Sequence, residues 1–374
     1  MAINNKDQKI KKSRNSRYTN VAKRVQKSVF NQGIDEIDTT QVEYSDEVYN
    51  TVDLFAGCGG ISKGFEDAKF KSIYAVEIDP DSAATYSHNF KDAHVFHGDI
   101  NELTDDEVRR EIGNKKVHVL MGGFPCQGFS VAGERKLLDE RNQLYKQMIR
   151  FAKLLKPDFV VGENVPGIYT MKGPLPLEEE NYFMHRISNE FDEIGYKVSA
   201  RVLESADFGV PQYRPRMIFI ANRHKIPNPF PKKTIEHPKD HKTIEEIDRL
   251  EKTERDPSIN HEWTRHQSTT ISRIKKVKPG HSLYDTYADA FKRQYENTPS
   301  MTVKENHGGT HIHHKLDRCI SAREMAILQS FPDDFFFKGT MKRAMFQIGN
   351  AVPPLLAKHV ALALRPSLDK LYNE

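Results

Sequence analysis

The chain has 374 residues, of which 37% are hydrophobic and 29% charged, which suits one large domain and a smaller one with an extensive polar surface. No apolar stretch approaches the roughly 20 residues that span a bilayer, so no membrane segment is expected. Three cysteines (Cys58, Cys126 and Cys319) are too few for a disulfide framework, and the lysine-rich start lacks the apolar core of a secretory leader, so a cytoplasmic location is expected.

The net charge of +4 is unevenly distributed along the chain. Nine lysines and arginines precede Phe30, against the single acid Asp7. Such a run is typical either of a solvated tail or of an arm that contacts nucleic-acid phosphates, and both interpretations remain open. We assign residues 1–47 to a basic N-terminal tail.

From Tyr49 onward, short apolar runs alternate with amphipathic stretches. Strand, turn and helix repeated in this order predict an α/β fold with a doubly wound, mostly parallel sheet. Ligands of such sheets bind at the carboxyl ends of the strands. The expected strands are residues 52–55, 72–76, 94–96, 117–121 and 159–161, and the expected helices are 61–68, 81–89 and 144–155.

The periodicity fades after Ile220, where prolines and polar residues dominate. Residues 223–338 are therefore predicted to form a second, smaller and irregular domain that follows a first domain at 48–222. Ser321 and Glu324 predict a capping box at the start of a helix over 321–330. A closing helix over 353–364 belongs to a C-terminal segment, 339–374, which is expected to return to the first domain.

A glycine-rich turn follows the first predicted strand, with Phe55, Gly57 and Gly59 in it. It is not a Walker A loop, and Ser62 stands where the dinucleotide fingerprint has its third glycine. Glu77 ends the next strand, where a carboxylate can accept hydrogen bonds from a ribose, and Asp99 follows the third strand. The set suits a ligand with adenosine but no diphosphate, although a glycine turn that serves packing alone is the alternative.

Two further motifs carry the chemistry. Phe124-Pro125-Cys126-Gln127 places a thiol after the fourth strand, and Glu163-Asn164-Val165 places a carboxyl group at the end of the fifth. A cysteine thiolate is nucleophilic enough to add to an electron-poor ring carbon near neutral pH. A carboxyl group can hold the ring nitrogen that takes up a proton during the addition. Together they indicate a cytosine-modifying enzyme.

With these motifs in this order, the chain resembles the cytosine-5 DNA methyltransferase family of the bacterial restriction-modification type. The family's ordered blocks match residues 53–60, Glu77, Asp99, 123–127, 163–165, 212–216 and 347–350. The resemblance implies a class I methyltransferase fold, S-adenosylmethionine as cofactor and double-stranded DNA as substrate, with a cytosine flipped out of the helix. It also implies that residues 223–338 are the target-recognition domain.

The resemblance also implies roles for individual residues. Cys126 would attack C6 of the cytosine, Glu163 would hold N3 and the exocyclic amine, and Arg216 with Arg214 would hold O2 and a nearby phosphate. The cofactor would contact Phe55, Gly57, Gly59, Glu77, Ile78, Asp99, Pro125, Asn350 and Val352. The resemblance also places Gln127, Ser130, Gly133 and Arg135 against DNA. From their charge we expect Arg265, Arg273 and Lys275 to contact DNA as well, with a solvated face as the alternative. His307, Gly308 and Gly309 are expected to form a flexible loop that approaches base edges.

Other features support simpler interpretations or leave alternatives open. No metal site is expected, because no cysteine or well-spaced acid completes the cluster of His307, His311, His313 and His314. The protein is expected to act as a monomer, beside a restriction endonuclease that acts separately. A tRNA cytosine-5 methyltransferase on the same fold and a non-catalytic DNA-binding relative are the alternative functions.

Overall fold

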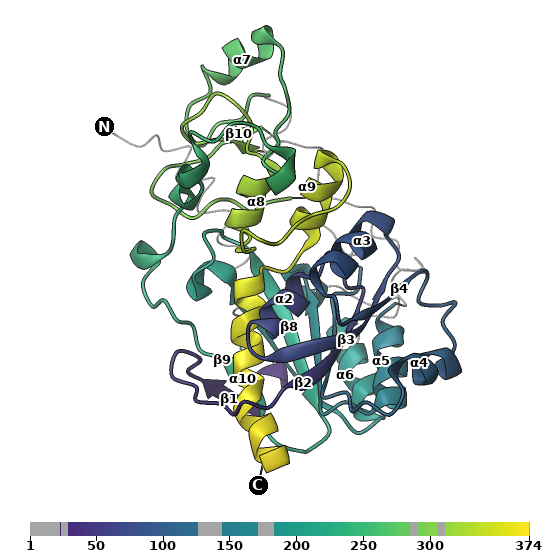
Figure 1. Cartoon of the computed structure of the whole chain (residues 1–374). Helices are drawn as coiled ribbons and strands as arrows, with labels where there is room; N and C mark the ends of the chain where they lie inside the picture. Colours follow the sequence, from purple (N-terminus) through teal and green to yellow (C-terminus); the bar gives the residue numbers. More distant parts are fainter. Residues whose placement is uncertain are drawn as a thin grey trace. The chain divides into compact units, whose positions relative to one another are not determined.

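The chain folds into two compact units, each made of several chain segments (Figure 1). The computed structural model describes residues 23, 29–125, 144–170, 183–284, 291–304 and 311–373. Unit 1 comprises Met1–Glu36, Lys116–Leu203 and Pro215–Phe230, and unit 2 comprises Ile37–Lys115, Glu204–Arg214 and Pro231–Glu374. The predicted domain boundaries at 48, 223 and 339 differ from this division and stay a prediction.

Unit 1 is built on four neighbouring strands in the order β5-β6-β8-β7. β5 (Val119–Gly122) and β6 (Phe159–Asn164) are parallel, whereas β8 (Pro215–Asn222) runs antiparallel to β6. Their apolar residues are almost entirely buried, as expected for a sheet covered on both faces. The other elements are β7 (Lys197–Glu204), α5 (Tyr145–Leu155), α6 (Phe183–Asp192), the 3-10 helices η1 (Val29–Asn31) and η3 (Pro166–Thr170), and the short pair β1 (Ile34–Ile37) and β9 (Asn228–Pro231).

Part of the predicted N-terminal tail belongs to this unit: residues 29–36 lie in it, whereas residues 37–47 belong to unit 2. Phe30 is buried, and its ring packs edge-on against His185 at 4.7 Å between centroids. Arg201 also forms a 2.6 Å ion pair with Glu36. Residues 29–36 are therefore folded, and the described residues before them comprise Lys23 alone.

Unit 2 carries three parallel strands in the order β4-β3-β2. They are β2 (Tyr49–Leu54), β3 (Phe70–Glu77) and β4 (His94–His97), and they alternate with α2 (Gly60–Glu66), α3 (Pro80–Asn89) and α4 (Asp105–Ile112). The C-terminal part adds α8 (Ala322–Leu328), α9 (Met341–Asn350) and α10 (Pro354–Asn373). Between β9 and α8 the described elements are short: η6 (Pro238–Asp240), η7 (Ile244–Leu250), η8 (Pro257–Ile259), α7 (Ser268–Ile274), β10 (Lys292–Arg293) and β11 (His311–Ile312). The irregular character predicted for this region is confirmed.

The predicted capping box at α8 is confirmed, and the C-terminal helix α10 lies against α2. The backbone N–H of Glu324 donates to the Ser321 hydroxyl at 3.0 Å, and the Glu324 carboxylate accepts from the Ser321 N–H at 2.7 Å. α10 packs on α2 because Gly64 has no side chain: a Cβ there would lie 2.2 Å from the carbonyl oxygen of Pro354. No helix among the described residues is long and apolar enough to cross a bilayer.

The glycine turn gives a testable prediction of stability. Gly59 has φ of 94°, and a Cβ on it would lie 2.3 Å from the Phe90 ring. Gly59→Ala should therefore add a clash to backbone strain and lower the free energy of unfolding by about 3 kcal/mol or more. Gly195→Ala is the matched control: its φ is 84°, and no atom lies within 4 Å of the added Cβ. It should cost only about 1 kcal/mol in urea denaturation, and equal losses would contradict this account.

Candidate active site and cofactor turn

The glycine turn of unit 2 follows β2, and a backbone hydrogen bond attaches it to the neighbouring strand β3. Phe55, Gly57 and Gly59 all have positive φ, at 57°, 56° and 94°. The Ala56 N–H donates to the Val76 carbonyl at 3.1 Å, and the Gly59 N–H donates to the Ala56 carbonyl at 3.0 Å. A turn wound this tightly keeps its backbone close to any ligand above it, which is why glycine is needed at two of the positions.

Glu77 joins this turn to the end of β3. Its carboxylate accepts from the Gly57 N–H at 2.6 Å and from the Asp79 N–H at 2.7 Å. Burial raises the pKa of Glu77, while these two backbone donors act in the opposite direction. The Ile78 N–H also stabilises the carboxylate. Because a carboxylate has about four lone-pair directions, it can still accept from a hydroxyl group of a ligand.

Two other predicted cofactor residues are exposed in the way that a binding site requires. The side chain of Ile78, directly after Glu77, is 64% exposed, although isoleucine is usually buried. Asp99 is partly exposed beyond β4, where one of its oxygens accepts from the Asn101 N–H at 2.9 Å and the other is available. An apolar side chain and an acid beside the glycine turn suit an adenosine-containing ligand.

The C-terminal block returns to the same turn. A Cβ on Gly60 would lie 2.3 Å from the Val352 carbonyl oxygen, which shows how closely the two segments approach. The Cys58 thiol lies 3.7 Å from the carbonyl oxygen of Gln347, and the Gln347 side chain accepts from Thr85 at 2.6 Å. Asn350, at the end of α9, is exposed. Gln347 thus holds the 347–350 segment against the glycine turn. Its position as the first residue of the 347–350 motif is a sequence signal for this role.

The geometry corrects the expected role of Arg214. Its side chain is only 1% exposed, and its guanidinium donates to the carbonyl oxygens of Val303 (2.7 Å), Gly349 (2.6 Å) and Ala351 (2.9 Å). A guanidinium committed to three buried carbonyls holds the 349–351 turn and is not presented to a base or a phosphate. The prediction that it joins Arg216 in contacting substrate is therefore wrong. These carbonyls come from residues 89 to 137 positions away, so the sequence motif alone could not reveal them.

A substitution at this position should affect stability first. Arg214→Lys retains the charge but replaces the planar fork with one ammonium group that cannot reach all three carbonyls. We expect the free energy of unfolding to fall by about 2 kcal/mol or more, because buried acceptors lose a charged donor. Arg110→Lys, at an exposed position, is the control and should change it by less than about 0.5 kcal/mol in urea denaturation. An unchanged midpoint for Arg214→Lys would contradict the assignment.

In unit 1, Glu163 and Arg216 form the polar centre expected from the motifs. The Arg216 Nε lies 2.7 Å from a Glu163 carboxylate oxygen, and each side chain is 12% exposed. Glu163 lies near the end of β6, and Arg216 lies in the antiparallel strand β8, two residues from Ile218, which is the ladder partner of Glu163. The pair is thus nearly buried but still has an open side.

The residues that lead to Cys126 lie directly beside this pair. A Cβ on Gly123 would lie 3.0 Å from the second Glu163 oxygen, so a larger residue there would press on the carboxylate. The Asn164 side chain donates to the Phe124 carbonyl at 3.2 Å and accepts from the Val165 N–H at 2.9 Å. Asn164 therefore fixes the segment that ends at Pro125. The sequence motif contained this residue, but its role depends on the pairing of β5 with β6.

The remaining predicted contacts divide into two groups. Arg265, Arg273 and Lys275 are exposed in the irregular part of unit 2 and stay predictions. The other group lies outside the described residues: Cys126, Gln127, Ser130, Gly133, Arg135, His307, Gly308 and Gly309.

A buried carboxyl group under the glycine turn gives a pH-dependent prediction. Asp53 is 1% exposed and accepts from the Ser62 hydroxyl at 2.7 Å, and that hydroxyl lies 2.6 Å from the Tyr86 hydroxyl. Burial raises the pKa of Asp53 to about 7. The folded state therefore keeps a proton that the unfolded chain releases near pH 4, so this group makes stability fall as pH rises from about 4 to 7.

Asp53→Asn should remove that dependence. The free energy of unfolding of the variant minus that of the natural protein should increase between pH 5 and pH 8, because asparagine has no proton to lose. Urea denaturation of both proteins at the two pH values measures the difference, in which all shared titrations cancel. A difference that stays constant with pH would show that Asp53 titrates at an ordinary pKa.

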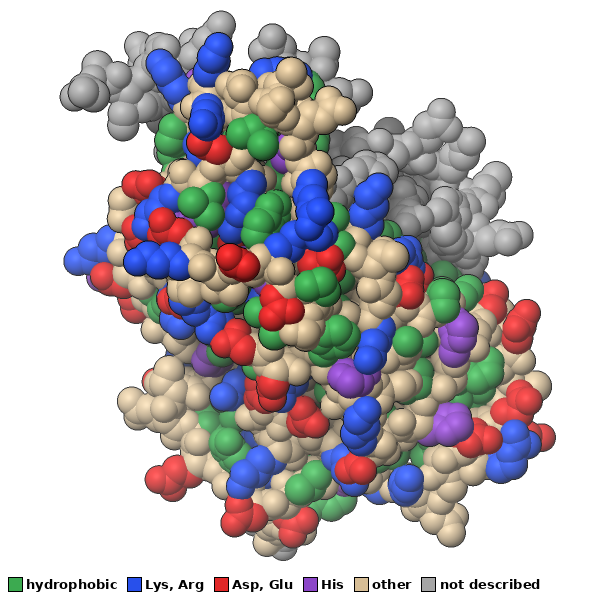
Figure 2. All heavy atoms as spheres, turned by 45° about the horizontal axis from the view of Figure 1, so that its top comes forward, with side chains coloured by type: hydrophobic (Ala, Val, Ile, Leu, Met, Phe, Trp, Pro, Cys, Tyr) green, Lys and Arg blue, Asp and Glu red, His purple; other side chains and the backbone are tan. Residues whose placement is uncertain are grey.

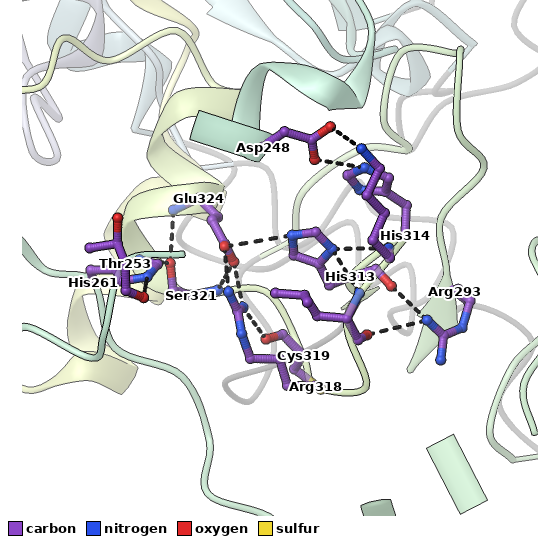
Figure 3. A network of polar contacts seen from close by, with 12 residues as sticks. Asp248, Thr253, His261, Arg293, His313, His314, Arg318, Cys319, Ser321 and Glu324 are labelled. Atoms are coloured by element: carbon purple, nitrogen blue, oxygen red, sulfur yellow. Dashed lines mark hydrogen bonds and ion pairs between the residues drawn. The ribbon is translucent and has the colours of Figure 1, made fainter. Parts of the chain in front are cut away.

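In the irregular region, His314 lies beside Asp248, an acid that is distant from it in the sequence (Figure 3). His314 Nε2 lies 2.9 Å from Asp248, and its ring stacks on His313 at 4.6 Å. However, His313 Nδ1 accepts from the backbone N–H groups of Lys315 (3.1 Å) and Leu316 (3.2 Å). The ring proton must then be on Nε2, whereas a histidine ligand presents a lone pair to the metal and donates from its other nitrogen. This donor set does not suit a metal ion.

Comparisons with known proteins agree with the site. Residues 49–365 match the family of C-5 cytosine-specific DNA methylases. The chain is 38% identical to the Type II methyltransferase M1.HphI of Haemophilus parahaemolyticus, covering 84% of this chain and 86% of the relative. It is 33% identical to the Type II methyltransferase M.DdeI of Desulfomicrobium norvegicum, covering 83% and 87%.

A solved structure gives the same result for the fold. It is titled a DNA modification methyltransferase encoded within a prophage of Escherichia coli, and it matches with a TM-score of 0.65 and 26% identity, over 87% of this chain and 100% of that one. The predicted α/β fold, with its mostly parallel sheet, is confirmed. The chain belongs to the C-5 cytosine-specific DNA methylase family.

Proposed function

We propose that this protein is a DNA (cytosine-5-)-methyltransferase that modifies a cytosine flipped out of a short, specific duplex sequence. The observation that carries the proposal is the nearly buried Glu163–Arg216 pair beside the segment that leads to Cys126. Family membership supports the same activity. Both charged members of the pair are retained, which argues against a non-catalytic relative.

The chemistry proceeds through a covalent adduct on Cys126. Its thiolate adds to C6 of the cytosine, and electron density moves toward N3, where the Glu163 carboxyl group provides a proton or a hydrogen bond. Arg216 orients Glu163 and has further donors for the ring oxygen. C5 would then bond to the methyl carbon while the bond from that carbon to the donor's sulfonium sulfur breaks and leaves its electron pair on sulfur. Loss of the C5 proton to a base and elimination of the Cys126 thiolate restore the ring and the enzyme.

The methyl donor that we propose is S-adenosylmethionine, which supplies an electrophilic methyl group when bound. Glu77 would accept from its ribose with the acceptor capacity that the backbone N–H groups of Gly57, Asp79 and Ile78 leave open. Ile78, which is exposed, would cover one face of the adenine, with Phe55 contributing to the same pocket. Asp99 would accept from the adenine amine, and Asn350 and Val352 would close the pocket from the C-terminal block.

We further infer that the protein protects DNA in a restriction-modification system. M1.HphI and M.DdeI, which match most of this chain, are both Type II methyltransferases. On this proposal the chain acts as a monomer, because a single flipped cytosine requires one active site. It acts in the cytoplasm, where its DNA substrate lies. The endonuclease of the system would act separately on unmodified DNA.

Transfer of a labelled methyl group tests this function against the RNA alternative. The purified protein, incubated with methyl-labelled S-adenosylmethionine, should label duplex DNA and leave tRNA unlabelled. Label in tRNA alone would support the tRNA methyltransferase instead. Bisulfite sequencing of DNA from cells that express the protein should then show methylation at one short sequence, which also identifies the recognition site.

A further inference from the structure

The first turn of α3 is bound by an arginine from α9 that no step of the proposed chemistry uses. α3 and α9 lie side by side within unit 2 (Figure 1). The Arg343 Nε lies 2.7 Å from an Asp81 carboxylate oxygen, and another nitrogen of the same guanidinium bonds Asp79. The planar fork of arginine allows one side chain to bind two acids in this way. We call these three residues the Arg343 clamp.

An ion pair at the surface is weak evidence for a function by itself. Figure 2 shows Lys and Arg side chains intermingled with Asp and Glu side chains on the face that it presents, so such pairs are common there. Water screens an exposed pair, and its contribution to stability is small. The side chains of the Arg343 clamp are only 23–35% exposed, whereas those of the surface pair Arg109–Asp106 are 60% and 93% exposed. The clamp is therefore partly shielded from water.

Asp79 joins the Arg343 clamp to the proposed cofactor residues. One of its carboxylate oxygens caps α3 by accepting from the Ser82 N–H at 2.9 Å and the Ser82 hydroxyl at 2.8 Å, and the other bonds Arg343. Burial acts to raise the pKa of Asp79, but the bonds from Ser82 and Arg343 outweigh it and lower the pKa. The Asp79 N–H donates to the Glu77 carboxylate at 2.7 Å. Asp79 is thus held through both oxygens and in turn holds Glu77.

The segment that leads into α9 approaches Asp81 closely enough to require glycine. Gly339 has φ of 91°, and a Cβ on it would lie 2.7 Å from an Asp81 oxygen. Thr340 then caps α9 by accepting from the Arg343 N–H at 3.4 Å. The backbone therefore places Arg343 in the first turn of α9, with its guanidinium at the acids of α3.

One face of α3 is bonded to the same C-terminal block. Asp81, Thr85 and Asn89 are four residues apart, so they share this face. The Thr85 hydroxyl donates to the Gln347 side chain at 2.6 Å. The Asn89 side chain donates to the Phe336 carbonyl at 2.9 Å and accepts from the Phe336 N–H at 3.1 Å. The Arg343 clamp is the end of this contact at which the chain enters α3.

We propose that Arg343 is a positioning residue for the cofactor, because it holds the 77–79 turn in the conformation that presents Glu77 and Ile78 to an adenosine group. Ile78 is 64% exposed and lies between two residues that are anchored, so its position depends on theirs. A turn that is fixed in advance loses less conformational entropy when a ligand binds, and this increases affinity. The inference rests on the proposed function, in which S-adenosylmethionine is the ligand with the adenosine group.

The test compares Arg343→Ala with Arg249→Ala in the full chain. Arg249 also binds an acid through two nitrogens in unit 2, with distances of 2.5 and 2.7 Å to Asp333. Isothermal titration calorimetry gives the affinity of each variant for S-adenosylmethionine and for S-adenosylhomocysteine, which has the same adenosine group and lacks the methyl group. Arg343→Ala should bind both about 5- to 10-fold more weakly and by the same factor, because the clamp acts on the adenosine end. Arg249→Ala should stay within about twofold of the natural protein.

Kinetics and two further variants separate positioning from a general loss of structure. With duplex DNA in excess, the KM of Arg343→Ala for S-adenosylmethionine should rise, while kcat at saturating cofactor should stay within about twofold. Arg343→Lys keeps the charge and can pair with one acid, so its affinity should lie between those of Arg343→Ala and the natural protein. Arg343→Ala/Asp81→Ala should bind the cofactor within about twofold of Arg343→Ala, because the contact between the two side chains is already lost.

Three results would overturn the proposal. If Arg343→Ala lost no more affinity than Arg249→Ala, the clamp would not position the turn. If only S-adenosylmethionine lost affinity, Arg343 would act at the sulfonium end, and if kcat alone fell, it would act on the chemical step. Failure of the proposed function is visible separately, because the natural protein would then bind no S-adenosylmethionine. A natural protein that binds it, combined with any result above, would reject the role of Arg343 alone.

Discussion

Cys126→Ala is expected to lower the rate of methyl transfer by about 10⁴-fold or more. Without the thiolate, no adduct forms at C6, and C5 of an aromatic cytosine is too weak a nucleophile to take the methyl group. Binding of the cofactor should persist, because Glu77, Ile78 and Asp99 are unchanged. Single-turnover transfer to duplex DNA measures the rate, and isothermal titration calorimetry measures cofactor affinity.

Cys319→Ala provides the matched control for this prediction. Cys319 is fully buried, and burial raises the pKa of its thiol to about 12, so it is not a nucleophile near neutral pH. Burial likewise raises the pKa of the Cys58 thiol. Cys319→Ala should therefore keep its turnover, apart from some loss of stability. Turnover by Cys126→Ala close to that of the natural protein would end the proposed mechanism.

Glu163→Gln is expected to reduce the rate of the chemical step by about 10²- to 10³-fold while DNA affinity changes little. Glutamine has the same shape but cannot provide the acidic proton at N3 as Cys126 adds. It also replaces the ionic partner of Arg216, whose Nε lies 2.7 Å from the carboxylate, with a neutral one. Single-turnover rates at saturating DNA and equilibrium binding of the same duplex separate the two effects.

Glu190→Gln controls for the loss of an ion pair in the same unit. Glu190 bonds Arg186 at 3.0 Å and the Tyr145 hydroxyl at 2.6 Å. The substitution is chemically identical, and this residue has no place in the proposed chemistry, so the rate should stay within about threefold. If Glu163→Gln weakened duplex binding and left the rate unchanged, Glu163 would be a binding residue and its role in the chemistry would be wrong.

The strands and helices that frame the glycine turn could be predicted because their sequence patterns are local. Continuous apolar runs end at polar residues in β2, β3 and β6, and amphipathic helices follow them. Such patterns do not depend on distant residues, so the predicted ranges agree with the structure to within a few positions. The capping box at α8 was predictable for the same reason.

Other elements were missed although some of them carry a signal. β8 begins at Pro215, inside the 212–216 motif, whose prolines and arginines give no strand pattern, and it runs antiparallel to β6. α4 has only two buried residues, Val108 and Ile112, so its apolar face is weak. Its capping box of Thr104 and Glu107 could have located it. α9 contains the 347–350 motif, and these residues suggest a binding segment and not a helix.

The candidate site was predictable where a residue acts through its own motif, and not where its partners are distant in the chain. Glu163 and Arg216 meet as their motifs suggest. Arg214 belongs to the same motif as Arg216 but is bonded to carbonyls of Gly349 and Ala351. Asp248 likewise meets His314 across 66 positions of sequence. Long-range pairings of this kind depend on the folded chain and leave no local pattern.

The central claim is that Cys126 is joined covalently to the cytosine during turnover. A duplex in which the target cytosine carries fluorine at C5 tests it directly, because fluorine cannot leave as a cation after the methyl group is added, and the adduct cannot eliminate. With S-adenosylmethionine present, intact-mass measurement should show the protein bonded to methylated DNA, and peptide mapping should place the bond at Cys126. Full methyl transfer to the unmodified duplex, without any covalent complex on the fluorinated one, would contradict the account.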